Sequence, residues 1–156
     1  MGKRLGALSA VIAVLALAVG IALPALGSTG HAAQHQTIRV TAVDTELKLL
    51  DLGGTGFSLG NEIVFSQNLL QGATQIGHAG AVCTEVSVAR QEAQCIATYS
   101  FPGGQITGQA LVILGSTAPY AGSITGGTGK YEGAKGELHV QNVSPTEGIL
   151  TFHLEH

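Results

Sequence analysis

Charged and aromatic residues are scarce in this sequence of 156 residues. Asp, Glu, Lys and Arg together make up 11%, aromatic residues make up 4%, and tryptophan is absent. Behind residue 27, five basic side chains stand against ten acidic ones, a formal charge of 5 − 10 = −5. The sequence has no cluster of Lys and Arg of the kind that binds nucleic acid or anionic lipid. We therefore expect neither to be the partner.

Metal and hydrolase motifs are also missing. The histidines of the predicted strands do not have the short spacing of metal ligands; they are His78, His139 and His153. No Ser-His-Asp order or G-x-S-x-G elbow occurs. We predict no metal and no cofactor.

Glycine, by contrast, is abundant, with 23 residues but no Gly-X-Y period, which excludes collagen. The densest cluster, SITGGTGKYEGAKGELHVQ at residues 123–141, ends in an alternating run from Glu137 to Gln141. Glycine tolerates positive φ, and period-two alternation marks a half-buried strand, so this stretch predicts a tight turn that leads into a strand. It is not a phosphate loop, because Gly129-Lys130 is followed by Tyr131 and no helical pattern follows.

The N-terminus has the layout of a secretory signal peptide at residues 1–27. A short positive start precedes an apolar stretch from Leu5 to Leu23, and Pro24 and small residues follow. The stretch is long for a signal peptide, so an uncleaved membrane anchor is the alternative. Residues 28–35 then form a flexible leader and residues 36–156 the domain. We expect a secreted protein without stable membrane contact after cleavage, or a membrane-tethered one if the segment is retained.

The body of the chain consists of short alternating runs separated by glycine-rich turns, and helical periodicity is absent. We expect strands at 37–43, 61–70, 74–88, 94–101, 105–114, 122–125, 135–143 and 148–154. Residues 45–60 are less regular and predict a loop that acts as a lid. Eight short antiparallel strands either close or form a sandwich, and closure into a barrel removes every edge. The predicted fold is an all-β, eight-stranded antiparallel barrel.

The two cysteines lie on predicted neighbouring strands, on either side of a turn near Arg90-Gln91. Cys83 and Cys95 have the same parity relative to this turn, so a hairpin would bring them roughly opposite each other. In an exported protein, two cysteines this close predict a disulfide, which contributes about 3 kcal/mol in the chain-entropy model. The alternative is a free Cys83 thiol that lines the interior.

From Gly60 onward, the sequence resembles the allene oxide cyclase barrel, a fold shared with plant dirigent proteins. The segments that carry the resemblance, in order, are GNEIVF at 60–65, 76–83, ATYSF at 97–101, GQITGQ at 104–109, ITGGTGKYEGAKG at 124–136 and TFHL at 151–154. The glycine segment is the most specific of them. The resemblance implies an eight-stranded barrel that is often trimeric, so we expect a possible homotrimer.

The resemblance also maps functional residues of the plant cyclase onto this chain. Its first-strand glutamate and asparagine fall on Ala42 and Asp44, its second-strand asparagine on Gln67, and its cysteine on Cys83. The cyclase constellation is therefore incomplete here, and the arginine of the dirigent pocket is replaced in the run Ala121-Gly122-Ser123. Some bacterial polyketide cyclases resemble the same barrel and act mainly by shaping an apolar pocket.

Strand alternation puts Ile63, Phe65 and Gln67 on one face, and the resemblance makes this face the lumen. The candidate ligand-binding residues are Ile63, Phe65, Glu85 and Phe101. Gln67 either hydrogen-bonds a ligand or is a satisfied structural amide.

Two further residues complete the candidate catalytic set of Asp44, Gln67 and Tyr99. Asp44 is either a buried acid that donates a proton or a residue that caps a turn. Tyr99 is either a hydroxyl donor in the pocket or a core aromatic residue with a polar tip.

Two classes of function follow. In the first, the secreted allene oxide cyclase-like or dirigent-like barrel binds a small apolar molecule in its lumen and acts as an isomerase that steers ring closure or stereoselective coupling. In the second, it is a non-catalytic extracellular binding or structural protein. The first class requires an open cavity of roughly 300 Å³ or more, whereas a structural barrel is packed shut.

Overall fold

The computed structural model describes residues 35–53, 56 and 58–155. The predicted signal peptide and residues 28–34 of the predicted leader lie outside this range. Among the residues described, there is no helix with the length and apolarity needed to span a bilayer.

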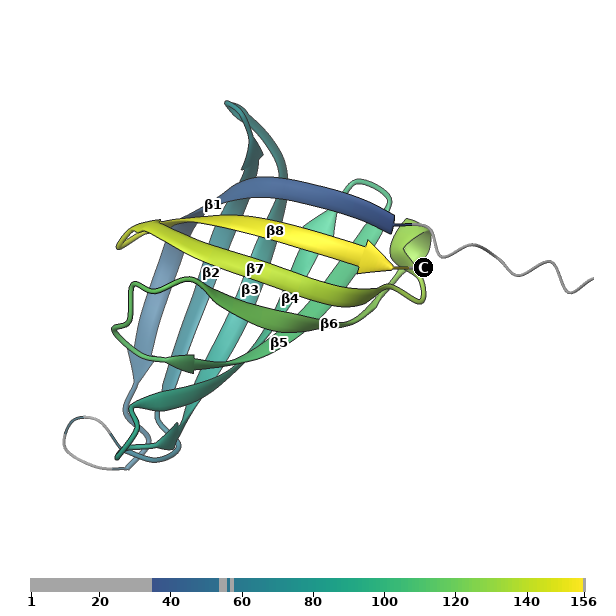
Figure 1. Ribbon diagram of the computed structural model, residues 1–156. Helices are drawn as coiled ribbons and strands as arrows, with labels where there is room; N and C mark the ends of the chain where they lie inside the picture. The colour runs from purple at the N-terminus through teal and green to yellow at the C-terminus, as the bar shows by residue number, and fades with distance from the viewer. Residues whose placement is uncertain (1–34, 54–55, 57, 156) are drawn as a thin grey trace, which may run out of the picture. The chain divides into compact units, whose positions relative to one another are not determined.

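Eight antiparallel strands form one closed barrel in sequential order, with β8 paired to β1 (Figure 1). They are β1 (His35–Leu50), β2 (Glu62–Gln71), β3 (Thr74–Ser87), β4 (Glu92–Phe101), β5 (Gly104–Ile113), β6 (Tyr120–Gly127), β7 (Lys135–Ser144) and β8 (Glu147–Glu155). The only helical element among the described residues is the 3-10 turn η1 (Gly129–Tyr131). The predicted eight-stranded barrel is therefore confirmed.

The first strand is longer than predicted at both ends. His35, assigned to the flexible leader, pairs with Glu155 and begins β1. The predicted loop at residues 45–60 is wrong in its first part, because β1 continues to Leu50 and pairs with β2 beyond a bulge near Asp44. Within this stretch, Leu47 and Leu49 are strand residues that stand opposite Phe65 and Ile63. Both leucine side chains are nevertheless exposed.

The remaining loop, at residues 51–61, is organised by the side chain of Asn61. Its Oδ1 accepts hydrogen bonds from Leu52 N and Ser58 Oγ, both at 3.0 Å, and its Nδ2 donates to Gly56 O at 2.9 Å. Backbone hydrogen bonds between Gly60, Asn61 and Glu85 then fasten the loop to β3. The buried side chain of Asn61 therefore holds the described part of the loop together.

One end of the barrel is sealed by aromatic packing. Phe101 lies between Tyr131 and Phe152, with ring centroids 6.0 and 5.6 Å away, and both of these residues are fully buried. The predicted glycine turn supplies Tyr131, because Gly129 has φ +60° and lets η1 approach the β4–β5 turn. A Cβ at Gly129 would collide with the carbonyl oxygen of Gly103, which accepts a hydrogen bond from Lys130 N. This position therefore requires glycine.

The opposite end of the barrel stays open because its strands end at different heights. The β1–β8 ladder ends at the pair Val43↔Glu147, and the β5–β6 ladder ends at Gln109↔Ser123. β1 and β5 continue beyond these pairs, and the sheet from β2 to β5 extends past β6, β7 and β8 (Figure 1). The lumen therefore reaches the surface at this end.

Candidate functional site

The open half of the barrel contains a cavity of about 240 Å³ that is lined by residues from all eight strands. Small side chains create this space, since the wall includes Ala42, Ala79, Ala81 and Ala97. The cavity is not packed shut, although it is somewhat smaller than the roughly 300 Å³ expected from the sequence. An engineered cavity of about 150 Å³ already binds benzene. The lumen is therefore large enough for one small organic molecule.

Asp44 and Gln67 form the polar pair of this cavity. They stand opposite each other on β1 and β2, and Gln67 Nε2 donates a hydrogen bond of 2.8 Å to Asp44 Oδ1. Asp44 N donates to Thr146 O at 2.9 Å. Asp44 therefore lies within β1 at its bulge, and the alternative in which it caps a turn is wrong. Gln67 holds the carboxylate in place, which leaves Asp44 Oδ2 for other partners.

The three candidate catalytic residues lie on one row of the sheet. Asp44 pairs with Gln67, Gln67 with Ala79, and Ala79 with Tyr99, from β1 to β4. Neighbouring strands are about 4.8 Å apart, so the row curves around the barrel wall. Because the side chain of Ala79 is only a methyl group, space remains between the Asp44–Gln67 pair and the phenol of Tyr99. The structure thus brings together all three residues at one level of the lumen.

Tyr99 is buried, with its ring edge-on to Phe152 at 4.8 Å, and it lines the cavity. Within the described part of the chain, its hydroxyl makes no hydrogen bond. Burial raises the pKa of Tyr99, and the nearby Tyr120 adds to the rise. Burial also raises the pKa of Tyr120. Both side chains therefore remain neutral phenols, which can donate a hydrogen bond to a ligand.

Tyr120 was missed by the sequence analysis. The sixth strand was expected only from Gly122, whereas β6 begins at Tyr120, which pairs with Val140 of β7. The available signal was alternation, because Tyr120, Gly122 and Ile124 share the inner face. Asn142 and Glu147 also line the cavity and were not predicted.

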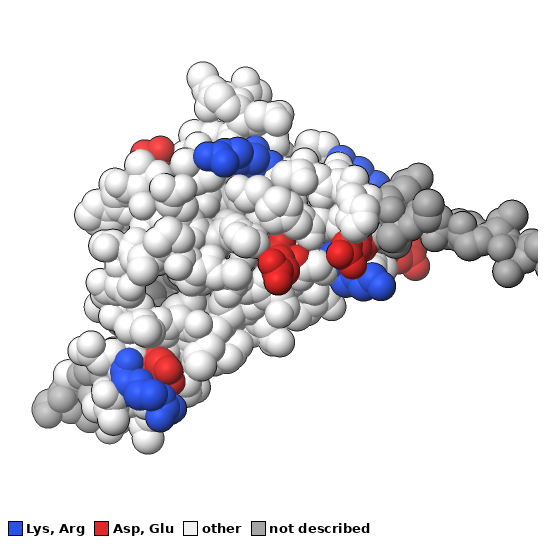
Figure 2. Space-filling model, in the orientation of Figure 1, with Lys and Arg blue, Asp and Glu red and all other residues white. Residues whose placement is uncertain are grey.

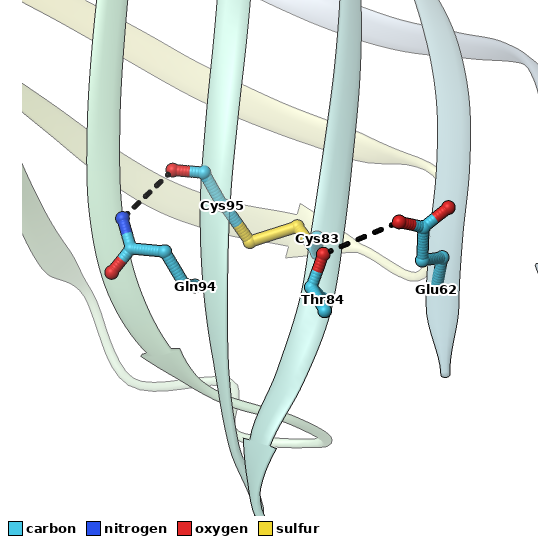
Figure 3. Close-up of a disulfide and its surroundings, with 5 residues drawn as sticks. All are labelled: Glu62, Cys83, Thr84, Gln94 and Cys95. Atoms are coloured by element: carbon cyan, nitrogen blue, oxygen red, sulfur yellow. Dashed lines mark hydrogen bonds between the residues drawn. A yellow bond between two sulfur atoms is a disulfide. The ribbon is translucent and has the colours of Figure 1, made fainter. Parts of the chain in front are cut away.

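The predicted disulfide is present between Cys83 of β3 and Cys95 of β4, which are directly opposite in register (Figure 3). Neither cysteine is free, so the alternative of a reactive Cys83 thiol is wrong. The disulfide forms part of the cavity wall, together with the predicted ligand-binding residues Ile63 and Phe65.

Two of the predicted ligand-binding residues lie elsewhere. Phe101 belongs to the aromatic packing of the sealed end. Glu85 lies two residues beyond Cys83, where its backbone bonds to Gly60 and Asn61. Neither Phe101 nor Glu85 lines the cavity. Glu85 is buried, and its Oε2 has no hydrogen-bond partner in the described part of the structure. Strand alternation alone did not identify the cavity wall, because an inward-facing residue can lie above or below the cavity along the barrel axis.

The polar groups offer no evident metal site. Across residues 35–53, 56 and 58–155, no three His, Cys, Asp or Glu side chains are grouped to hold a metal ion. The pair His139–Glu137, 3.0 Å apart, is exposed on the outer surface. Lys, Arg, Asp and Glu are scattered over the face seen in Figure 2 without forming a patch of one sign.

Known proteins share this barrel. No curated protein matches the chain. Among solved structures, the pyocyanin demethylase is 29% identical, with a TM-score of 0.68 over 76% of this chain and 99% of its own. The pterocarpan synthase dirigent protein GePTS1 is 16% identical, with a TM-score of 0.61 over 79% and 89% of the two chains. The Diels Alderase AbmU from Streptomyces koyangensis is 15% identical, with a TM-score of 0.60 over 75% and 64%.

The family comparison covers most of the described chain. The model of the "Allene oxide cyclase barrel like domain" matches residues 34–152, which include seven complete strands and most of β8. The match contains the sealed end with its glycine turn, the disulfide and the whole cavity wall. The chain therefore belongs to the allene oxide cyclase barrel-like family.

Proposed function

We propose that the protein is a secreted enzyme that holds one small, largely apolar molecule in its lumen and isomerises or cyclises it. The observation that carries this proposal is the cavity of about 240 Å³, sealed at one end. Its mainly apolar wall carries the Asp44–Gln67 pair, two tyrosines and further polar residues, among them Asn142 and Glu147. Ligand sites of this kind are mainly apolar, with a few polar groups that fix orientation.

Confinement supplies part of the catalysis. Holding a flexible molecule near its reactive geometry lowers a barrier by several kcal/mol without an acid or a base. Asp44 adds proton transfer, because its Oδ1 is fixed by Gln67 and its Oδ2 makes no hydrogen bond to the described residues. A positioned carboxyl group contributes about 10²- to 10⁴-fold to a rate.

The relatives and the disulfide support the proposal. Barrels with this fold include proteins named as a Diels Alderase and as a pterocarpan synthase dirigent protein, which act in ring-forming chemistry according to their names. The Cys83–Cys95 disulfide favours an oxidising compartment, as expected for an exported protein.

The test begins with native mass spectrometry of protein purified from its own culture medium, followed by extraction and identification of the bound molecule. The molecule is then incubated with wild type, Asp44→Asn and Glu132→Gln, a control in the exposed turn beside η1. We expect all three to bind it and only Asp44→Asn to lose conversion. Binding without conversion by wild type would favour the non-catalytic binding protein. A barrel that retains no molecule and binds no small apolar compound would refute the lumen as a ligand site.

A second reaction to test is demethylation of pyocyanin. The specific observation is the 29% identity to the pyocyanin demethylase over 99% of that chain. Incubation of wild type and Asp44→Asn with pyocyanin, followed by mass spectrometry of the products, tests it. A demethylated product formed only by wild type would support this activity, and unchanged pyocyanin would exclude it under those conditions.

A further inference from the structure

We infer that Tyr99 and Tyr120 together form an oxyanion site, and that the ligand of the lumen is a neutral molecule with a carbonyl oxygen conjugated to, or able to enolise within, an apolar frame. This assignment rests on the proposed use of the lumen as the ligand site. It adds Tyr120 to the site and assigns a chemical class to the occupant.

The geometry that supports this pair lies in the strand between the two tyrosines. Tyr99 is on β4 and Tyr120 on β6, and β5 separates them with Gly108, which lines the same cavity. A Cβ at Gly108 would lie 3.8 Å from Cε2 of Tyr99, so a larger residue there would crowd the phenol. Gly122, also in the wall, keeps β6 free of a side chain beside Tyr120. Both phenols therefore face the same open volume.

The hydroxyls of both tyrosines are available to a ligand. Neither makes a hydrogen bond within the described residues. Tyr99 is buried and Tyr120 is 37% exposed, and the hydroxyl of a buried tyrosine usually finds a partner. Both side chains line the one cavity, so a single ligand can contact the two of them. A carbonyl oxygen has two lone pairs and accepts two such donors. Donors held in fixed positions stabilise the negative charge that develops on this oxygen.

Asp44 completes the reaction that this arrangement permits. The carboxylate removes a proton from the carbon next to the carbonyl, and the C–H electron pair forms a C=C bond. The carbonyl π pair moves to the oxygen, where Tyr99 and Tyr120 donate hydrogen bonds to the enolate. In a β,γ-unsaturated ketone, the oxygen pair then re-forms the C=O bond, and the enolate C=C pair shifts to the α,β position. The β,γ C=C pair takes the proton back from Asp44 at the γ-carbon. Atoms and electrons balance, and the net change is an isomerisation without a cofactor.

The test compares binding of 2-tetralone, a bicyclic ketone, with tetralin, which has the same rings without the carbonyl. Calorimetry is done on wild type, Tyr99→Phe and Tyr120→Phe, with Tyr131→Phe as a control that removes a hydroxyl from the sealed end. We expect wild type to prefer 2-tetralone about tenfold or more, and each lumen variant to reduce this preference about three- to tenfold, as for one lost hydrogen bond. The Tyr131 variant should keep it.

A second readout follows exchange of the protons next to the carbonyl of 2-tetralone in D2O by NMR. We expect wild type to accelerate the exchange, Asp44→Asn to abolish the acceleration, and both lumen tyrosine variants to reduce it. Equal binding of 2-tetralone and tetralin by wild type, or a preference that both tyrosine variants retain, overturns the oxyanion site while leaving the lumen as a ligand site. Failure of both compounds to bind overturns the proposed function as well.

Discussion

Tyr99 differs from an ordinary tyrosine because it is buried and its hydroxyl has no hydrogen-bond partner among the described residues, whereas Tyr120 is 37% exposed. Burial opposes the charged phenolate, so the pKa of Tyr99 rises above its ordinary value of 10.0, and that of Tyr120 rises as well. The same desolvation that keeps Tyr99 neutral makes its O–H group a strong donor to an oxygen in the lumen. The cost is a pH dependence of stability.

We predict that the free energy of unfolding falls as the pH rises above about 10. Above this pH, the folded protein retains the Tyr99 proton, whereas the unfolded chain releases it. The contribution of Tyr99 to the free energy of unfolding is therefore unchanged below pH 10 and decreases by about 1.4 kcal/mol per pH unit above it. Urea unfolding of wild type and Tyr99→Phe from about pH 9 to about pH 11 measures this. The variant should show a shallower decline, and identical slopes would contradict the prediction.

At the scale of single elements, the β3–β4 hairpin and the β6–β7 turn determine whether the wall can form. The hairpin turns at Gln91, which has φ +53°, and the Cys83–Cys95 disulfide fastens its two strands (Figure 3). The β6–β7 turn contains η1 and places Tyr131 over the sealed end. The β3–β4 hairpin stabilises the cavity wall, and the β6–β7 turn stabilises the sealed end of the barrel.

Replacement of both cysteines, Cys83→Ser with Cys95→Ser, should lower the free energy of unfolding by about 3 kcal/mol, because the unfolded chain regains the entropy of the closed loop. Chemical denaturation of the double variant and of wild type, each with and without reductant, measures the difference. Reductant should destabilise wild type only. A stable double variant would mean that the barrel register alone holds the hairpin.

The glycine turn offers a matched pair of substitutions. Gly129→Ala should lower the free energy of unfolding by at least about 2 kcal/mol, because it adds a collision with Gly103 to the cost of positive φ. Gly133→Ala serves as control, since Gly133 has φ +74° with no atom near its Cβ position, and should cost only about 1 kcal/mol. Thermal and urea unfolding would show the order, and equal losses would refute a role for the close approach.

At the scale of the whole molecule, the open half of the lumen has room for a ligand because small residues form part of its wall. The outer surface of β3, β4 and β5 carries exposed apolar side chains, among them Val86, Ile96, Leu111 and Ile113.

The possible homotrimer stays a prediction, and the mass of the native protein tests it.

A larger side chain in the lumen should change ligand binding without lowering the free energy of unfolding. Ala79→Leu places added carbon atoms between Gln67 and Tyr99, so it should abolish binding of 2-tetralone while leaving the free energy of unfolding unchanged or raised. His78→Leu, on the outward-facing neighbour, is the control and should bind normally. Calorimetry and thermal unfolding give the two quantities. Normal binding by Ala79→Leu would place the ligand outside the lumen.

Several features followed from local patterns that tertiary contacts did not override. Alternation marked the eight strands, parity around a short turn paired Cys83 with Cys95, and clustered glycine marked the turn at Gly129. Each of these rests on backbone preferences and on spacing along one hairpin or turn. These features establish an all-β chain with a closed sheet and a disulfide.

The site depended on relationships between strands that are far apart in sequence. The bulge near Asp44 and the extra length of β1 come from pairing with β2, which local propensity does not report. The ladders place Tyr99 level with Ile106 and Gly127, so only the closure of the whole barrel lets Tyr99 and Tyr120 line one cavity. The volume of the lumen is the small difference between the space that eight strands enclose and the side chains that fill it. For this reason the sequence by itself determined the barrel, and only the tertiary structure decided which inward-facing residues meet an open cavity.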